Sequence, residues 1–228
     1  SRGAVIEFKA KPQKVLDVAR VEGVRRLEPA TAAAAMNDLG GKRMRVSALR
    51  ALYPGLDGEG VTVAVTDSGV DFRHAAFSQD QGAPTSTNLN TRILYYEARE
   101  GQYTEGIPGD NDGHGTHVSA SILGNGALSQ TAVSIPGSDG PPYGTNQFAG
   151  VAPRARLVML EDFNSFTATQ QTSVAYSQGA RISNNSWGYN GIFDYGVVSE
   201  LWDELVRDAY ATTDQGDRNE MVILFAAG

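Results

Sequence analysis

The sequence contains no cysteine, which excludes disulfide bonds and thiolate metal sites. It also lacks long apolar runs, since no stretch approaches the roughly 20 residues of a membrane-spanning helix. Positive charge is scarce: the chain has 19 Lys and Arg but 26 Asp and Glu, which gives a net charge of -7. No segment contains a concentrated run of basic residues. Because binding to nucleic acid needs concentrated Lys and Arg, that role is disfavoured.

What the sequence does contain is typical of a globular protein. Its 228 residues are 41% hydrophobic, and its mean hydropathy is -0.29. This length suits one large domain or two small ones that bury a sizeable core. The 26 glycines cluster near the motifs described below.

Strand and helix patterns alternate along most of the chain. Strands are expected at 61–65, 93–96, 156–160, 181–186 and 221–227, and helices at 46–52, 115–123, 168–178 and 197–212. This order predicts an α/β fold with a mainly parallel sheet and helices on both faces. The run at 221–227 is apolar on both faces, which predicts an interior strand. The Gly, Ser and Pro content of 124–150 predicts a loop.

The first residues predict a small separate unit. Residues 4–10 alternate apolar and polar side chains as a half-buried strand does. A short helical pattern opens at Pro12 and closes at Gly23, and 24–28 returns as a strand. We therefore expect a β-α-β unit over residues 1–29, followed by one larger domain over residues 30–228. Alternatively, the first unit is an edge of that larger domain.

Two places in the larger domain carry candidate catalytic residues. Asp67 directly follows a buried strand, at the sheet edge where α/β proteins bind ligands; alternatively, it caps the following turn. His114 lies between two glycines at the start of a helix, where a base of near-neutral pKa could exchange a proton with a hydroxyl nucleophile. A structural role for His114, or metal binding with His117 at i, i+3, remains open, although no third ligand accompanies the pair at a familiar zinc spacing.

A third place is Ser186-Trp187-Gly188, at the end of the expected strand 181–186. A strand end of this kind can line a groove in which an extended peptide adds as a further strand. Alternatively, Trp187 is an aromatic anchor of the core. Alone, this motif distinguishes neither interpretation.

Taken together, these segments resemble the subtilisin family of serine proteases (subtilases). The resemblance covers roughly 42–228 and rests on the order of five motifs: Asp-Ser-Gly-Val-Asp at 67–71, His-Gly-Thr-His at 114–117, Gly-Val-Ala-Pro at 150–153, Asn-Ser-Trp-Gly at 185–188, and the strand at 222–228. It implies a subtilisin-like fold and a serine endopeptidase with an Asp-His-Ser triad. By this match, Asp67 would stabilise the imidazolium of His114, the general base and then acid.

The resemblance implies further features. Residues 186–188 would bind substrate backbone and wall the pocket for the residue before the scissile bond. Residues 1–29 resemble the second half of a subtilase propeptide, which implies a zymogen. Catalysis would need no cofactor, and the enzyme would be secreted or extracytoplasmic. Structural calcium is compatible with the resemblance, with oxygens offered by Asp110, Asn111 and Asp112, but they do not make a full ligand set.

The sequence departs from the family pattern in one respect. It holds no Gly-Thr-Ser-Met-Ala type motif for the nucleophile, and the oxyanion-hole Asn would come directly after Gly228. We therefore expect a second chain or a continuation to supply both residues. Two other functions remain as alternatives: a catalytically inactive subtilase-like scaffold that binds protein or peptide, and a metal hydrolase built on His114 and His117.

Overall fold

The computed structural model describes residues 17, 20–21, 37–77, 92–97, 109–132, 140–161, 164, 166–188, 195–210 and 219–226. The chain divides into two compact units, Ser1–Ala35 and Met36–Gly228. Nearly all of the β-α-β unit expected over 1–29 lies outside the described residues, so that unit stays a prediction. The fold described below is that of the second unit.

Five strands form one parallel sheet. They are β1 (Thr62–Asp67), β2 (Ile93–Glu97), β3 (Arg156–Glu161), β4 (Ile182–Asn185) and β5 (Val222–Phe225), in the order β2-β3-β1-β4-β5. Every neighbouring pair of these strands is parallel. Each strand falls within about two residues of its expected range, and the predicted α/β fold class is confirmed.

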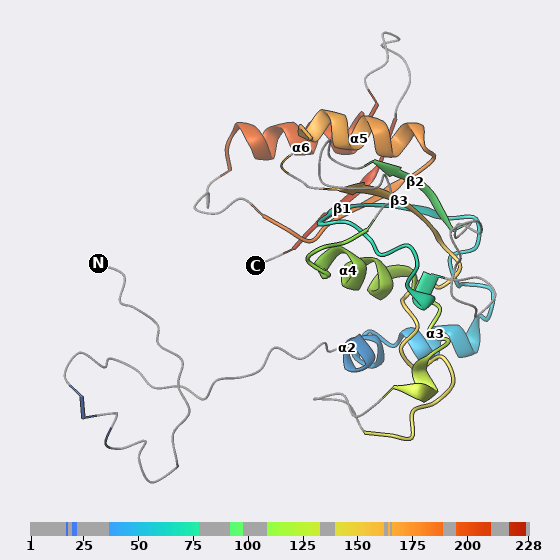
Figure 1. The fold of residues 1–228 in the computed structure, drawn as a ribbon. Helices are drawn as coiled ribbons and strands as arrows, with labels where there is room; N and C mark the ends of the chain where they lie inside the picture. Colours follow the sequence, from blue (N-terminus) through green and yellow to red (C-terminus); the bar gives the residue numbers. More distant parts are fainter. Residues whose placement is uncertain are drawn as a thin grey trace. The chain divides into compact units, whose positions relative to one another are not determined.

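Helices cover both faces of the sheet. Helix α4 (His114–Leu123) lies on one face, and α5 (Ala168–Ser177) and α6 (Val197–Arg207) lie on the other (Figure 1). The chain before the sheet forms α2 (Asn37–Arg43) and α3 (Val46–Leu52), and two short 3-10 turns are η2 (Ala75–Phe77) and η3 (Ser129–Thr131). In the part of the chain that the structure describes, no helix is long and apolar enough to cross a membrane.

Two helices differ from the sequence expectation. Helix α2 was not expected, because its two central residues, Gly40 and Gly41, are poor helix formers. Helix α6 was expected to reach residue 212 and ends at Arg207. The chain leaves the helix there because the Ala209 N–H donates to the carbonyl of Asn219 at 2.9 Å, a tertiary contact that no local pattern shows.

The alternation of side chains along β1 determines which face each residue meets. Val63 and Val65 join a buried cluster with Val118 and Leu123 of α4, whereas Ala64 joins the cluster on the α5 side of the sheet. Because side chains of a strand alternate with period two, Asp67 shares the face of Val63 and Val65. The strand therefore directs Asp67 toward the helix that carries His114.

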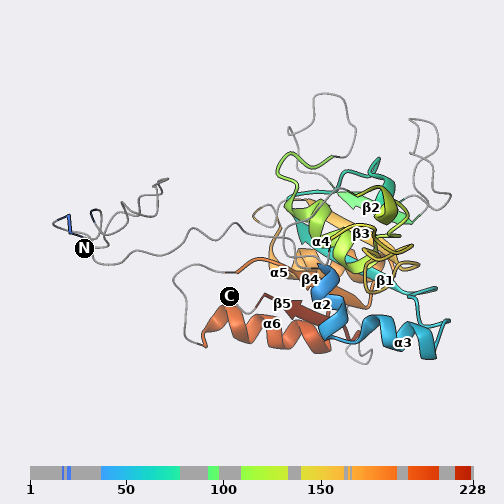
Figure 2. The same ribbon diagram turned by 90° about the horizontal axis from the view of Figure 1, so that it is seen from below.

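Strand β5 is the strand for which the apolar sequence predicts an interior position in the sheet. It lies at one edge of the described sheet, and Val222, Leu224 and Phe225 are 54%, 50% and 39% exposed. Its partner in the described sheet is β4 alone, with Asn185 opposite Phe225. Because that prediction assumed further strands from a second chain or a continuation, the interior position of β5 stays a prediction. Helix α6 lies beside β5 (Figure 2).

Candidate active site

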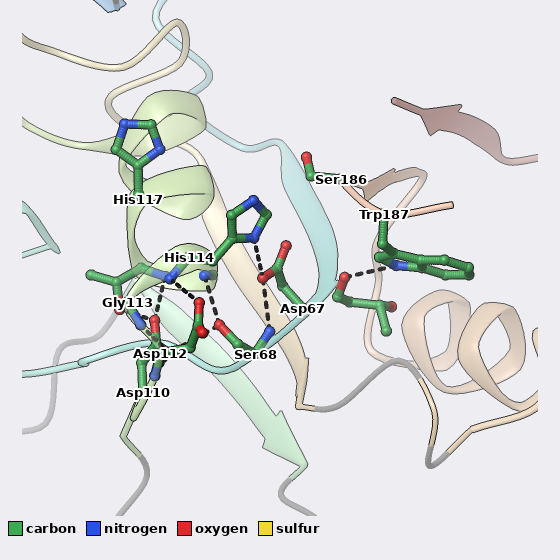
Figure 3. A network of polar contacts seen from close by, with 12 residues as sticks. Asp67, Ser68, Asp110, Asp112, Gly113, His114, His117, Ser186 and Trp187 are labelled. Carbon is green, nitrogen blue, oxygen red and sulfur yellow. Dashed lines mark hydrogen bonds and ion pairs between the residues drawn. The ribbon is translucent and has the colours of Figure 1, made fainter. Parts of the chain in front are cut away.

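The structure brings Asp67 and His114 into direct contact. The Nδ1 atom of His114 lies 2.7 Å from Oδ1 of Asp67 (Figure 3). Asp67 is the last residue of β1, and its side chain is 2% exposed; His114 is the first residue of α4, and its side chain is 52% exposed. A carboxylate can only accept, so Nδ1 carries the hydrogen. The proton-accepting nitrogen, Nε2, is on the opposite side of the ring.

Glycine makes this close approach of strand and helix feasible. A Cβ on Gly115 would overlap the carbonyl oxygen of Gly69, and one on Gly69 would overlap the carbonyl oxygen of Gly109. Gly113 precedes the helix at φ 89, a conformation that costs glycine little. The glycines at these positions therefore let the first turn of α4 pack against the end of β1.

The electrostatics of the pair favour a charged imidazole. The hydrogen bond to Asp67 raises the pKa of His114 above its ordinary value; burial opposes this increase, and the charges of Asp67, Asp112 and Asp110 add to it. Asp67 also accepts a hydrogen bond from the backbone N–H of Ser68 at 2.8 Å through the same oxygen. Its Oδ2 is buried without a hydrogen-bond partner among the described residues. The arrangement suits a base whose protonated form is stabilised by a buried carboxylate.

Asp110 takes a part in this site that the sequence did not indicate. Its carboxylate accepts hydrogen bonds from Ser68 next to Asp67, and from Gly113 and Thr116 around the start of α4. From the sequence, Asp110 was a candidate only for calcium binding. A signal was present, because an acidic residue shortly before a helix commonly bonds its first N–H groups.

Calcium does not fit the oxygens of Asp110. Both of them already accept N–H or O–H donors, which a calcium ion would have to displace. Across the described residues, no group of three or more His, Cys, Asp or Glu side chains is placed to hold a metal ion. His117 is exposed and points away from Asp67 (Figure 3), so the arrangement gives no support to a metal centre at His114 and His117.

Residues 186–188 follow β4 on the other side of Asp67 from His114 (Figure 3). The Oγ of Ser186 accepts a hydrogen bond from Asn184 at 2.9 Å, and Gly188 is exposed with open space where a Cβ would be. Gly188 is therefore accessible, whereas Ser186 is half-buried.

Trp187 is half-buried and makes structural contacts as well. Its Nε1 donates to the carbonyl of Thr66 at 3.1 Å. Its ring packs edge-to-face against Phe225 at 5.3 Å and Trp202 at 6.3 Å between centroids. Because Thr66 directly precedes Asp67, the indole also anchors the end of β1. Trp187 thus connects the segment after β4 to the core.

A comparison with protein families matches residues 58–228 to the subtilase family. The match covers more than half of the chain. The chain belongs to the subtilase family. The resemblance inferred from the motif order is thereby confirmed, and the Asp67–His114 pair lies within the matched region of this subtilase.

Individual relatives agree with this assignment. The subtilase is 31% identical over 163 residues to bacillopeptidase F of Bacillus subtilis (strain 168), which covers 63% of this chain and 10% of that protein. It is 31% identical over 109 residues to serine protease AprX of the same organism, covering 48% of this chain and 18% of that protein. The chain thus spans less than a fifth of the length of either relative.

A solved protease structure has a similar fold. The Clostridium perfringens CspB protease superposes with a TM-score of 0.50 at 19% sequence identity, covering 80% of this chain and 39% of that one. At this level of identity, the likeness concerns the fold alone.

Proposed function

We propose that this subtilase is a serine endopeptidase in which Asp67 and His114 are two members of an Asp-His-Ser triad. The observation that carries the proposal is the 2.7 Å contact between His114 Nδ1 and Asp67 Oδ1. A buried carboxylate on Nδ1 fixes the tautomer and leaves Nε2 to accept a proton. Membership of the subtilase family supports the same chemistry.

In this mechanism, His114 Nε2 takes the proton of a serine hydroxyl as its oxygen attacks the scissile carbonyl carbon. Asp67 stabilises the resulting imidazolium without taking its proton. His114 then gives the proton to the leaving amine, and an acyl-enzyme forms. Water repeats the sequence to release the acid and regenerate the serine.

The serine and the oxyanion-hole Asn are proposed to come from residues outside these 228, on the same chain or on a second one. This part of the proposal rests on the absence of a Gly-Thr-Ser-Met-Ala type motif from the sequence. Substrate is proposed to lie along residues 186–188 as an added strand. Residues 1–29 are proposed to be the second half of a propeptide, and the enzyme is proposed to be secreted or extracytoplasmic, which membership of the family supports.

A fluorophosphonate probe tests this function on the full-length protein. We expect labelling of one serine, and peptide mapping should locate it outside the 228 residues. His114→Ala should abolish labelling and peptide amide hydrolysis while leaving circular dichroism unchanged. The matched control is His117→Ala, which removes an exposed imidazole from the same helix and should keep both activities.

Two outcomes would contradict the proposal. Retention of more than about a tenth of turnover by His114→Ala would remove His114 from the mechanism. Absence of labelling in the folded wild-type protein would favour the alternative function, an inactive subtilase-like scaffold that binds protein or peptide.

A further inference from the structure

The carboxylate of Asp110 is the centre of the polar network behind the Asp67–His114 pair. Its Oδ1 accepts from Ser68 Oγ at 3.0 Å and from the N–H groups of Asp112 and Gly113 at 3.1 and 2.8 Å. Its Oδ2 accepts from the N–H and the hydroxyl of Thr116 at 2.8 and 2.6 Å. Five donors on one carboxylate make it an organising group rather than a solvated surface charge.

The donors belong to the segments that carry the two candidate catalytic residues. Ser68 directly follows Asp67, and its hydroxyl, which donates to Asp110, also accepts the N–H of Gly115 at 2.9 Å. Gly115 directly follows His114. One serine hydroxyl and one carboxylate thus connect the residue after Asp67 to the residue after His114 (Figure 3).

Asp110 also bonds the first turn of α4 in place of a local cap. The residue at the cap position is Gly113, which has no side chain to accept the free N–H groups of the helix. Asp110 accepts from Gly113 and Thr116 instead. Hydrogen bonds from Thr116, Gly113 and Ser68 outweigh the opposing effect of burial and hold the pKa of Asp110 below its ordinary value, so the network keeps a charged acceptor.

We propose that Asp110 is a positioning residue that fixes the start of α4 against the end of β1 and thereby sets the contact between His114 and Asp67. The proposal rests on the proposed function. A hydrogen bond of 2.7 Å weakens steeply when its atoms separate or turn, and a displacement of about 1 Å in a catalytic group can cost about a hundredfold in rate. Without Asp110, the bond from the Gly115 N–H to Ser68 Oγ would remain, but Ser68, Gly113 and Thr116 would lose the acceptor that they share.

A simpler role for Asp110 would be its charge alone. The charged groups that act on His114 are Asp67 at the end of β1, and Asp110 and Asp112 in the loop before α4. Asp112 provides a matched control, because it is exposed and, among the described residues, its side chain accepts a single long bond of 3.3 Å from the His114 N–H. Asp112→Asn removes a nearby charge and leaves the network of Asp110 in place.

The test is an NMR titration of His114 in the full-length protein, labelled with nitrogen-15 histidine and assigned with a His114→Gln variant. We expect Asp110→Ala to move the pKa of His114 toward 6.5, the ordinary histidine value, by more than Asp112→Asn does. Asp110→Asn keeps one acceptor oxygen and should fall between wild type and Asp110→Ala. In kinetics, kcat of Asp110→Ala should fall about tenfold or more, with KM little changed.

Either of two results would overturn the proposal. Equal decreases in the pKa of His114 in Asp110→Ala and Asp112→Asn would show that Asp110 acts on His114 through its charge alone. An unchanged pKa of His114 with a lower melting temperature would show that Asp110 only stabilises the helix. If Asp110→Ala does not fold, Ser68→Ala breaks the connection between the two segments with a smaller change, and an unchanged pKa there overturns the proposal equally. The titration does not require catalytic turnover. Its result can therefore be distinguished from a failure of the proposed protease function.

Discussion

Gly115 packs so closely on Gly69 that a Cβ on Gly115 would overlap the carbonyl oxygen of Gly69 and come within 3.1 Å of the Asp67 Cβ. This contact joins the first turn of α4 to the turn after β1. The distance between His114 and Asp67 therefore depends on residue 115 having no Cβ.

Gly115→Ala should therefore destabilise the protein, although alanine is the better helix former by about 1 kcal/mol. The new Cβ meets backbone atoms, which cannot rotate away, so the helix start must shift and lengthen the His114–Asp67 contact. We expect a lower melting temperature and a loss of kcat. Gly40→Ala in α2 is the control, because nothing lies within 4 Å of its added Cβ, and it should be neutral or stabilising. Equal effects of the two substitutions would contradict the steric argument.

Asp67→Asn should lower kcat by roughly 10⁴ in the full-length enzyme, by analogy with the same change in a serine protease triad. The amide can present a donor to Nδ1, which then favours the wrong tautomer of His114. Circular dichroism should stay unchanged. Asp57→Asn is the matched control: it removes the charge that pairs with Arg154 at 3.5 Å, keeps an oxygen that can accept the Glu59 N–H, and should leave kcat unchanged. A loss of less than about tenfold in Asp67→Asn would remove Asp67 from the mechanism.

The raised pKa of His114 predicts the pH dependence of activity. His114 must be neutral to accept the serine proton, so kcat/KM should fall as pH decreases through its pKa. The hydrogen bond to Asp67 raises that pKa above 6.5, and the acidic limb of the profile should therefore lie above pH 6.5. A limb at or below this value would show that the contact does not hold in solution.

The same pKa also predicts the pH dependence of stability. Because the folded-state pKa of His114 exceeds the unfolded value, the folded state binds the proton more tightly. The contribution of the pair is fully present below the unfolded pKa, about 6.5, and is lost as pH rises through the folded pKa. Solvent screening reduces it, since the His114 side chain is 52% exposed. The unfolding free energy of wild type relative to His114→Gln should therefore decrease as the pH rises from below about 6.5 through the raised pKa of His114; an increase would contradict the sign.

Trp187 should contribute to stability through its indole N–H. Trp187→Phe keeps an aromatic ring beside Phe225 and removes the donor to the Thr66 carbonyl, so we expect a loss of about 1 kcal/mol in unfolding free energy. Trp187→Ala also removes the ring contacts and should cost more. Tyr195→Phe is the control, because its hydrogen bond to Asp203 is exposed. No loss of stability in Trp187→Phe would contradict the anchoring role.

Trp187 is also the residue whose substrate contact remains a prediction. Hydrolysis of peptides that differ upstream of the cleaved bond should show a reduced preference for large apolar residues in Trp187→Ala. A large loss of stability with an unchanged preference would assign Trp187 to the core alone.

The sequence alone determined the alternation of strands and helices, and the motif order that leads to the subtilase family. These features can be predicted from the sequence because periodicity and glycine spacing are local properties that extend over only a few residues. It also singled out Asp67 and His114, whose catalytic roles stay predictions. Only the tertiary structure decided that these residues touch, that Asp110 connects their segments and that α6 ends at Arg207. Each of these depends on which distant segments pack together, and packing between elements leaves little trace in the periodicity of either one.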